Sequence, residues 1–517
     1  MRRIDIAISL LVLAVTVLVV MTLGARGARA DAGGAVASAR EFRQAHEAEI
    51  LAGFADFLRL PNVAADLDDM QRNAAYMREQ FAARDVQLDL LEIEGVPPLV
   101  TGRIDVPGAE RTLGIYVHYD GQPVDQSRWT NDPWEPVLYT SAIHAGGEPR
   151  AFPVSGERVD PEARLYARSA GDDKAPIVAL LAALDALDSA EFAISSNIVF
   201  LFDGEEERGS PHLGDYLDRY RDRFEDVDLW LFCDGPVHQS RRPQVVYGVR
   251  GVTGMEVTVY GASRPLHSGH YGNWAPVPGQ MLAELLASMK APDGKVLING
   301  FYDSFEPLTE AEEAAIDALP EVDAQLKHEL ALARTEGEGE RLERRLLLPS
   351  LTIRGLSSGN VGERARNVIP STATAALGVR LVRGNDPAHM LDLVEAHIRD
   401  KGYHTVRDDP DAETLRSHAR VAKVTRGTGY PASRAPMDHP LAQQVVEAAG
   451  RAAGEPVLQV PSLGGTLPVF LFSEVLGQPA IIVPIANHDN NQHAADENIR
   501  LANLWYGIDL YAALLTM

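Results

Sequence analysis

Short apolar runs, each long enough for one buried strand, alternate along this chain with stretches of helical pattern. The runs are apolar at nearly every position, which is typical of parallel strands that are covered on both faces. The alternation predicts an α/β domain with a mostly parallel sheet flanked by helices. The predicted strands are Leu113–His118, Ile198–Asp203, Leu229–Cys233 and Ala480–Ile485, and the helical stretches are Ala175–Leu187, Leu441–Ala453 and Leu467–Leu476.

Acidic and imidazole side chains lie at or just after probable strand ends. Because the carboxyl ends of parallel strands meet at one edge of a sheet, we expect these side chains to gather in one crevice. Two histidines with at least three carboxylates suit two divalent metals roughly 3.5–4 Å apart, which stabilise a tetrahedral intermediate. The pattern therefore predicts a hydrolase. The segments are His118-Tyr119-Asp120, Asp172-Asp173-Lys174, Glu205-Glu206-Glu207, Asp234 and His493.

The order and the residues of these segments resemble those of the zinc aminoacylase/carboxypeptidase/carnosinase family of di-metal exopeptidases. The resemblance is greatest to the carnosinase-type dipeptidase branch of that family. The family signatures are His-x-Asp, Asp-Asp-Lys, Glu-Glu-x-Gly-Ser, a lone acidic residue after the next strand, and a histidine near the C-terminus. All five occur here in that order, and the resemblance covers roughly residues 40–517. One motif alone would be a weak signal, whereas five in register are a strong one.

The resemblance implies a set of metal ligands. Asp172 would bridge two Zn²⁺ ions, with Mn²⁺ or Co²⁺ as alternatives, and the Asp172-Asp173 peptide would be cis. The remaining ligands would be His118 and Asp234 on one ion and Glu207 and His493 on the other.

Two further points concern the histidines. Asp120 lies two residues after His118, on the same face of a strand, where it can accept a hydrogen bond from the far ring nitrogen and orient the ligand. His488 competes with His493 for the role of C-terminal ligand. The family's tail motif, His-x-x-x-Glu, fits His493 with Glu497 and does not fit His488.

The three consecutive glutamates leave a choice of register. The family pair stands directly before x-Gly-Ser, which selects Glu206 and Glu207 and leaves Glu205 outside the pair. The resemblance then makes Glu206 the general base, which takes a proton from a metal-bound water and delivers it to the leaving amine. The alternative is a solvated acidic turn without a catalytic role.

Between residues 250 and 428 the sequence pattern changes. Apolar and polar residues alternate, as expected of antiparallel strands with one solvated face. The order of strands and helices predicts a two-layer α+β (βαββαβ) domain, so that a catalytic domain at 38–249 and 429–517 is interrupted by a lid domain at 250–428. The predicted elements are Met255–Tyr260, Pro278–Met289, Leu351–Arg354, Thr374–Val382, Pro387–Lys401 and Val421–Thr425.

Two segments are expected to be less compact. Thr309–Leu347 is rich in Glu and Ala and predicts a solvated helical hairpin, and Asp31–Ala37 is expected to be disordered. The resemblance implies that the lid domain mediates a homodimer.

The lid and the second catalytic segment also offer candidate substrate contacts. The resemblance implies that His267 reaches across the dimer to the developing oxyanion, and that Asn367 and Arg380 hold substrate. An arginine fork suits a terminal carboxylate, although a strand arginine is commonly a surface ion pair. Gly465 and Thr466 are expected to open a helix whose free amides form a carboxylate seat.

The chain departs from the family pattern in two places. Ala167-Arg168-Ser169 and Ala175 stand where family members have Gly-Arg-Gly and Gly. Tyr430 stands where the carnosinase branch has a histidine, which leaves the pocket for the leaving residue open.

The first thirty residues resemble a secretory signal peptide. Arg2 and Arg3 precede an apolar run at Ile6–Leu23, and Ala28-Arg29-Ala30 offers a small-x-small cleavage site. We expect a secreted or periplasmic protein without stable membrane association after cleavage. The alternative is an uncleaved membrane anchor, because the run approaches a spanning length.

Charge and cysteine content limit the partners. The formal charge is −25, which repels the phosphates of nucleic acids, so we expect no nucleic-acid partner. The single cysteine, Cys233, forms no intrachain disulfide and is interpreted as a buried, inert thiol.

We therefore predict a di-zinc exopeptidase that hydrolyses dipeptides or short peptides with a free C-terminal carboxylate. The alternative is an N-acyl-amino-acid amidohydrolase that uses the same metal site on acyl-amino-acid substrates. A non-catalytic binding protein is disfavoured, because neither Glu206 nor any ligand is missing.

Overall fold

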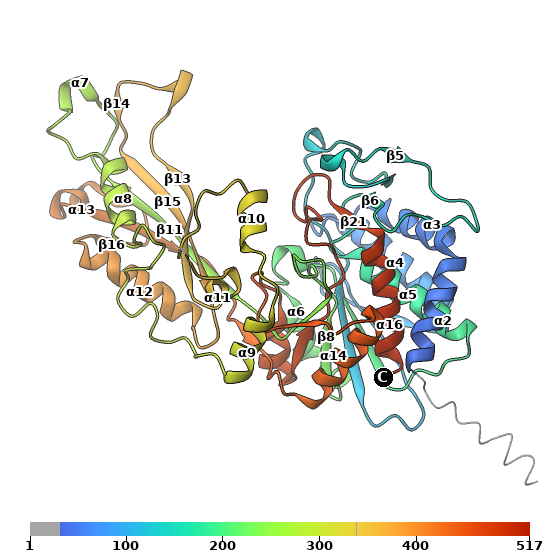
Figure 1. Ribbon diagram of the computed structural model, residues 1–517. Helices are drawn as coiled ribbons and strands as arrows, with labels where there is room; N and C mark the ends of the chain where they lie inside the picture. The colour runs from blue at the N-terminus through green and yellow to red at the C-terminus, as the bar shows by residue number, and fades with distance from the viewer. Residues whose placement is uncertain (1–31, 338) are drawn as a thin grey trace, which may run out of the picture.

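The computed structural model describes residues 32–337 and 339–517, which form two domains side by side (Figure 1). The predicted signal peptide at 1–30 lies outside the described residues. Among the helices of the described ranges, none is long and apolar enough to cross a membrane.

The larger domain is built on an eight-stranded sheet that is parallel in its centre. Strands β7, β3, β8 and β20 run in the same direction, while β1 and β2 pair antiparallel at one edge. In spatial order the strands are β1 (Leu88–Leu91), β2 (Leu99–Ile104), β7 (Asn197–Asp203), β3 (Thr112–His118), β8 (Leu229–Phe232), β20 (Ala480–Ile482), β9 (Gln244–Val246) and β19 (Leu458–Val460).

Helices cover both faces of this sheet. Alternate strand residues such as Ile115 and Phe200 pack against the larger helical layer, and Tyr116 and Trp230 pack on the other face. The fold class predicted for this domain is confirmed. The larger layer is α2 (Ala32–Ala45), α3 (Glu47–Leu58), α4 (Leu67–Ala82), α5 (Lys174–Ser189), α14 (Pro440–Ala453) and α16 (Leu501–Leu515), and the other has α6 (Leu213–Arg219), α15 (Val469–Leu471) and the π-helix Phe472–Leu476.

Helix α2 corrects one expectation from the sequence. The segment Asp31–Ala37 was expected to be disordered, and the catalytic domain to begin at residue 38. Asp31 lies outside the described residues, but the following residues form the start of α2, where Ala35 and Val36 are buried in the core. The small alanine and glycine side chains allow this helix to pack closely against α16 and α5.

The second domain contains a five-stranded sheet with two helices on one face. Met255, Val257 and Val259 of β11 point toward these helices, while the alternate residues face the larger domain's side. Its predicted alternating strands and both predicted helices are present. In spatial order the strands are β13 (Ser350–Ser357), β15 (Thr372–Leu381), β11 (Gly251–Tyr260), β17 (Val421–Arg426) and β16 (His404–Val406), and the helices are α8 (Pro278–Ala287) and α12 (Pro387–Asp400).

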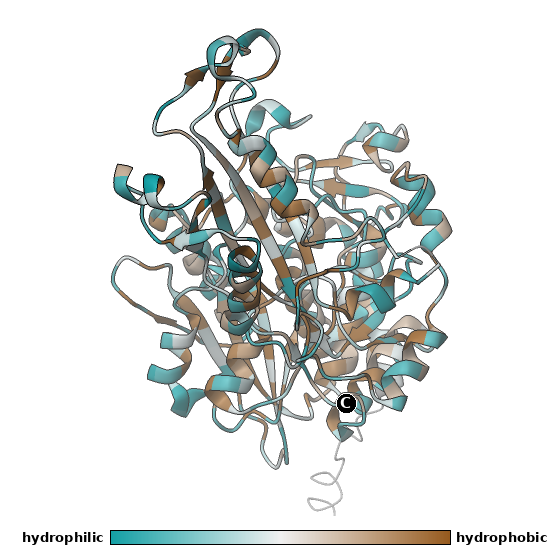
Figure 2. Ribbon diagram, turned by 90° about the vertical axis from the view of Figure 1, so that its left-hand side faces the viewer, coloured by the Kyte–Doolittle hydropathy of each residue, from teal (hydrophilic) through white to brown (hydrophobic). Residues whose placement is uncertain are grey.

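Smaller elements complete both domains. Figure 2 shows apolar strands of the second domain's sheet extending toward a mixed polar and apolar tip. The tip consists of β12 (Leu266–His267), β14 (Val368–Ile369) and α7 (Ser268–Tyr271); β10 (Gly248–Val249) pairs with β18 (Ser433–Arg434) at the domain junction; and β21 (Asn498–Arg500), β6 (Arg164–Tyr166), β4 (Val137–Tyr139) and β5 (Pro149–Arg150) form a four-stranded sheet.

The acidic excursion at Thr309–Leu347 differs from the predicted solvated hairpin. It forms three short helices, α9 (Glu310–Ala318), α10 (Asp323–Glu329) and α11 (Leu342–Leu346). A capping box between Thr309 and Glu312 begins α9. Glu312 is nevertheless buried, because it pairs with Arg434 at 2.7 Å across the domain junction. Helix α9 therefore packs against the larger domain, whereas α10 has no buried residue and is solvated as predicted.

Candidate metal centre

Three of the five predicted ligands lie at the carboxyl ends of three neighbouring parallel strands, while Asp172, just before α5, and His493, in the loop before β21, approach them from other segments. His118 ends β3, Asp234 follows β8 by two residues, and the glutamates follow β7 through the 3₁₀-helix η3 (Glu206–Arg208). Parallel strands deliver their ends to the same edge, which explains why residues more than a hundred positions apart meet here.

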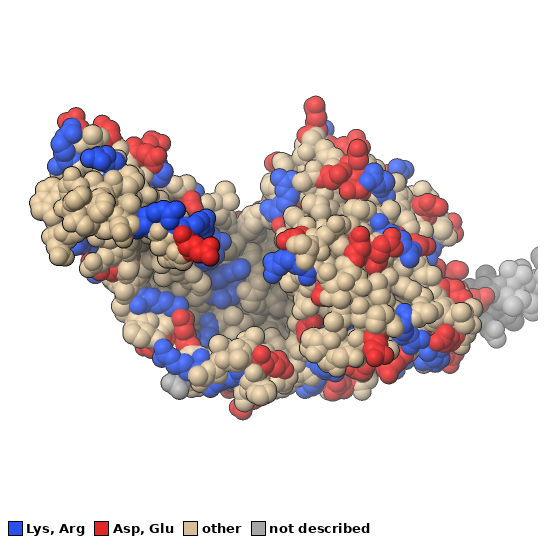
Figure 3. Space-filling model, turned by 90° about the horizontal axis from the view of Figure 1, so that it is seen from above, with Lys and Arg blue, Asp and Glu red and all other residues tan. Residues whose placement is uncertain are grey.

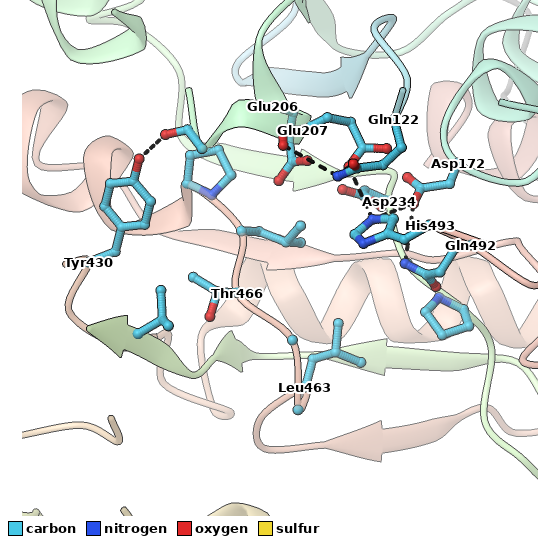
Figure 4. A pocket seen from close by; sticks show the side chains of 18 of the residues that line it. Gln122, Asp172, Glu206, Glu207, Asp234, Tyr430, Leu463, Thr466, Gln492 and His493 are labelled. Carbon is cyan, nitrogen blue, oxygen red and sulfur yellow. Dashed lines mark hydrogen bonds and ion pairs between the residues drawn. The ribbon is translucent and has the colours of Figure 1, made fainter. Parts of the chain in front are cut away.

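Asp172 lies between the two histidines predicted to be ligands. Its Oδ1 is 2.9 Å from Nε2 of His118, and its Oδ2 is 3.2 Å from Nε2 of His493. His493 Nε2 is also 3.0 Å from Oε2 of Glu207. The two oxygens of one carboxylate thus face two separate groups of donors, as a bridging ligand requires. Figure 4 shows the His493 side of this arrangement, with Asp172, His493 and Gln492 close together.

Donor atoms within 4.8 Å of one another form two groups in the described part of the chain. One contains Asp172, Glu207 and His493, and the other contains His118, Asp234 and Asp173. The sequence analysis did not assign Asp173 a role. Its position directly after Asp172, across a cis peptide bond as the family resemblance implied, is the signal that could have identified it.

Asp120 connects the ligand strand to the glutamate turn. Its Oδ1 is 3.3 Å from Nδ1 of His118, and its backbone oxygen is 3.2 Å from the same nitrogen. The two carboxylate oxygens of Asp120 also accept hydrogen bonds from the backbone amides of Glu206 and Glu207. Asp120 therefore orients the histidine and positions the turn that carries the glutamates.

The structure separates the three consecutive glutamates by environment. Glu206 and Glu207 line the same cavity as Asp172 and His493. Glu205 is buried outside that cavity, where its carboxylate lies 2.8 Å from Nδ1 of His212. Its backbone oxygen accepts hydrogen bonds from the amides of Arg208 and Ser210. This placement agrees with the register in which Glu206 and Glu207 form the functional pair.

The charge balance of the centre fits a divalent cation. Burial raises the pKa of Asp234 to about 7, and burial also raises the pKa of Glu206 well above its usual range. In contrast, Asp172 and Glu207 raise the pKa of His493 to about 11. The negative charge of these buried carboxylates, when they are ionised, exceeds the positive charge that two histidines can supply. Oxygen and imidazole donors of this kind suit divalent metals, which would supply the missing positive charge.

Glu497 holds the loop that carries Asp172, the predicted bridging ligand. Its carboxylate accepts from the backbone amides of Ser169, Gly171 and Asp172, and it forms a 2.5 Å ion pair with Arg168. Ser169, which replaces a family glycine, adopts a positive φ of 63°. Its backbone amide still donates to Glu497, so the loop keeps this contact. The tail motif identified Glu497, but its contact with the Asp172 loop could not be read from the sequence.

Arg380 and Thr466 meet at the far wall of the cavity. Arg380 donates a 2.6 Å hydrogen bond from Nη1 to the Thr466 hydroxyl, and both residues line the cavity with Gly465. Arg380 has no acidic partner within 4 Å among the described residues, which disfavours the surface ion-pair interpretation.

The glycine loop corrects another expectation. Gly464–Thr466 was expected to open a helix, but helix α15 begins only at Val469, with Pro468 as its N-cap. The loop instead runs beside β10, and the amides of Gly465 and Thr466 donate to none of the described residues. These amides remain available to a ligand without the contribution of a helix end.

His267 and Asn367 do not line the cavity of their own chain. They lie together at the tip of the smaller domain, where the amide of Ser268 donates to the backbone oxygen of Asn367. His267 is exposed and accepts a hydrogen bond from the Gly269 amide. The described chain alone thus leaves both side chains away from the metal centre.

The cavity also contains residues that the sequence analysis did not assign. Its volume is about 450 Å³. Gln122 and Gln492 donate to Glu207 and Asp172, respectively, and so hold the ligand carboxylates. Tyr430 lines the wall, donates to the backbone oxygen of Gly209, and stacks near Phe470. Gln122 stands two residues after Asp120, and Gln492 stands directly before His493. These positions are the sequence signal that could have identified the two glutamines.

The thiol interpreted as inert and the histidine that competed with His493 both lie outside the cavity lining. Cys233 is fully buried beneath the sheet, and burial raises the pKa of its thiol well above the usual range. His488 is not among the cavity residues, and its Nδ1 is buried without a partner among the described residues.

Comparison with known proteins places this geometry in context. The model of peptidase family M20/M25/M40 matches residues 114–517. The Cys-Gly metallodipeptidase dug1 of Schizosaccharomyces pombe is 24% identical over 464 residues, which covers 88% of this chain and 90% of that protein. The human Beta-Ala-His dipeptidase is 25% identical over 486 residues, with 87% of each chain covered.

Solved structures share the two-domain arrangement. An M20 family metallo-carboxypeptidase, Sso-CP2 from Sulfolobus solfataricus, superposes with a TM-score of 0.74 and 27% identity, over 90% of this chain and 98% of that one. Human carnosine dipeptidase 1 superposes with the same TM-score of 0.74 at 22% identity, over 93% of this chain and 98% of that one.

Proposed function

Because the chain belongs to peptidase family M20/M25/M40, we propose that it is a metallopeptidase that hydrolyses dipeptides or short peptides with a free C-terminal carboxylate. The observation that carries this proposal is the combination, in one cavity, of the two donor groups around Asp172 with Arg380 on the opposite wall. Its relatives include enzymes named as a Cys-Gly metallodipeptidase and a Beta-Ala-His dipeptidase.

The donor set would hold two divalent cations, with Zn²⁺ as the proposed metal and Mn²⁺ or Co²⁺ as substitutes. Asp172 would be shared between the ions, and the two donor groups described above would complete the sites. When bound, such a pair supplies an acidified water and positive charge for the scissile carbonyl. The two carboxylate oxygens of Asp172 contact different histidines, which supports two bound ions rather than one.

Glu206 is the proposed general base. It lines the cavity next to the ligand Glu207, and the Asp120 carboxylate fixes the backbone of both residues. A carboxylate at this position takes a proton from the attacking water and delivers it to the leaving amine. Burial, which raises the pKa of Glu206, favours its holding that proton between the two steps.

The free carboxylate of the substrate would bind at the far wall. Arg380 offers a planar fork, and the adjacent amides of Gly465 and Thr466 offer unpaired donors. This arrangement distinguishes the end of a peptide from its middle, since an internal residue presents no charge to Arg380.

A homodimer through the lid domain would complete the site. In this proposal, His267 of one chain reaches the oxyanion position of its partner, and Asn367 approaches with it. Both are at the exposed tip, and apolar side chains nearby are unusually open to solvent, with Leu356 at 64% and Val361 at 86% exposure. Exposed apolar patches of this kind mark association surfaces.

Export is proposed from the sequence of residues 1–30 alone, since these residues lie outside the described structure. The mature chain would begin near Asp31 in a secreted or periplasmic compartment. Mass spectrometry of the native protein tests this proposal, and a chain that retains Met1–Ala30 in the membrane fraction would indicate an anchor.

A substrate panel tests the proposed activity. The metal-loaded protein should hydrolyse dipeptides faster than the same dipeptides with C-terminal amides, and faster than N-acetyl and longer N-acyl amino acids. If acyl-amino acids are the better substrates, the enzyme is an amidohydrolase on the same site. If acids and amides are hydrolysed equally, the exopeptidase assignment is wrong.

A further inference from the structure

Arg380, which lines the cavity, has two further arginines of the lid domain near it, Arg250 and Arg354, and none of the three has an acidic partner in the described part of the chain. Among the described residues, no carboxylate oxygen lies within 4 Å of Arg250, Arg354 or Arg380, although ion pairs are frequent elsewhere in this acidic protein. Figure 3 shows Lys and Arg side chains in the hollow between the two domains. The lid side of this hollow is therefore positive, opposite the acidic metal centre, in a chain with a formal charge of −25.

The three arginines repel one another. Burial lowers the pKa of Arg380, and the charge of Arg354 lowers it further. Burial likewise lowers the pKa of Arg250 to about 10, with Arg380 as the next cause. Arg250 donates hydrogen bonds to the backbone oxygen of Leu348 and the hydroxyl of Ser350, which hold its side chain in place. The structure thus keeps three arginines without a carboxylate partner among its described residues, and Arg380 is close enough to both others to feel their charge.

The lid sheet provides space for Arg354. Its side chain lies across the face of the sheet, over Gly254 and Gly378, which pair across strands β11 and β15. A Cβ at Gly378 would lie 2.9 Å from Cδ of Arg354, and a Cβ at Gly254 would lie 3.1 Å from its Nη2. Two glycines therefore permit the guanidinium to rest on this face.

That face is the one that carries Arg380. Gly378 and Arg380 are two residues apart on β15, so they share a face and are separated by roughly 7 Å along the strand. Val252, which pairs with Arg380, lines the cavity. Glu256, the acidic residue on the same face of β11, forms no ion pair with either arginine. Arg354 thus extends the positive strip outward from the carboxylate site.

We propose that Arg354 binds a second carboxylate of the substrate, so that the enzyme prefers peptides whose C-terminal residue is glutamate or aspartate. The inference rests on the proposed function, in which Arg380 takes the main-chain carboxylate. The side-chain carboxylate of the same residue then faces Arg354, over the glycine pair, and neutralises the remaining positive charge of the strip.

A matched substrate pair tests this preference. Ala-Glu and Ala-Gln have the same size and differ in charge, so the ratio of their kcat/KM values isolates recognition of the carboxylate. We expect the ratio in the wild type to be about 5 or more, the effect of one partly exposed charge pair. Arg354→Met should bring the ratio to about 1, and Arg354→Glu should bring it below 1.

The control is Arg416→Met, on the exposed helix α13 (Ala412–Ser417) of the same domain, which should leave the ratio at its wild-type value. Equal hydrolysis of both dipeptides by the wild type and by Arg354→Met would overturn the inference and leave the proposed function intact. Hydrolysis of neither dipeptide would overturn both. A change in oligomeric state of Arg354→Met without a change in the ratio would assign Arg354 to the subunit interface instead, and would also overturn the inference.

Discussion

The carboxylate of Glu497 accepts a 2.9 Å hydrogen bond from the backbone amide of Asp172. Glu497 is fully buried and is held in turn by Arg168, so that the loop before helix α5 is fixed from one side. Burial raises the pKa of Glu497 to about 7, and the Arg168 guanidinium opposes that rise. This contact places the carboxylate of Asp172 between the two histidines.

Glu497→Gln should weaken metal binding without removing a ligand. The amide keeps one acceptor oxygen but loses the charge that pairs with Arg168, so the Asp172 loop is held less firmly. Changes to such supporting residues typically cost about 10–100-fold in metal affinity. Competition with a chelator measures the loss, and circular dichroism should show the fold retained. Unchanged affinity would mean that Glu497 does not position Asp172.

Glu206→Gln should reduce turnover by about 10²–10⁴-fold while the bound metal remains, since this is the usual contribution of a general base. Metal analysis and kcat measured on the same preparation check both parts. Glu205→Gln is the matched control, because Glu205 lies outside the cavity lining and pairs with His212. A large loss of turnover in Glu205→Gln, with Glu206→Gln near normal, would shift the register by one residue.

His267 should act on the partner chain. A His267→Ala chain and a Glu206→Gln chain are each expected to be nearly inactive as homodimers. In a mixed dimer, one of the two sites contains both an intact Glu206 and an intact His267, so activity should partly return. Differently tagged chains allow the mixed dimer to be purified and assayed. A purified mixed dimer without activity would argue against the role in trans.

Arg380→Ala should lower kcat/KM by roughly 10²-fold on dipeptides with a free carboxylate, because it removes a charge-assisted contact worth a few kcal/mol. The corresponding C-terminal amides should be affected much less. Arg416→Ala, on the outer surface of the same domain, serves as the control. Equal losses on acids and amides would place Arg380 in a role other than binding the carboxylate.

Much of the fold was predictable because its strands are apolar and short. The runs at Leu113–His118 and Ile198–Asp203 correspond to β3 and β7 with a difference of one residue at the start. The prediction of a disordered segment before residue 38 was wrong, because its described residues begin helix α2. A run of Ala and Gly has no amphipathic pattern, so its helical structure depends on packing that the sequence does not show. The burial of Glu312 depended in the same way on a distant partner, Arg434.

The candidate site was predictable where its residues follow strand ends within short motifs. His118, Asp172, Glu207, Asp234 and His493 are brought together as the family motifs implied. Asp173, Gln122 and Gln492 were not assigned, although they stand close in sequence to assigned residues, because their contacts become visible only in the fold. The place of Arg354 could not be inferred from the sequence at all. Arg354 gains its position only through the two glycines on the adjacent strands.

In the proposed function, two divalent metals at this centre drive hydrolysis of a peptide bond next to a free carboxylate. The most direct test is to titrate metal-free protein with Zn²⁺ or Mn²⁺ while measuring bound metal and dipeptide hydrolysis together. We predict no hydrolysis without metal, saturation at two ions per chain, and full activity only near that point. Full activity in the metal-free protein, or with a single ion bound per chain, would contradict the account.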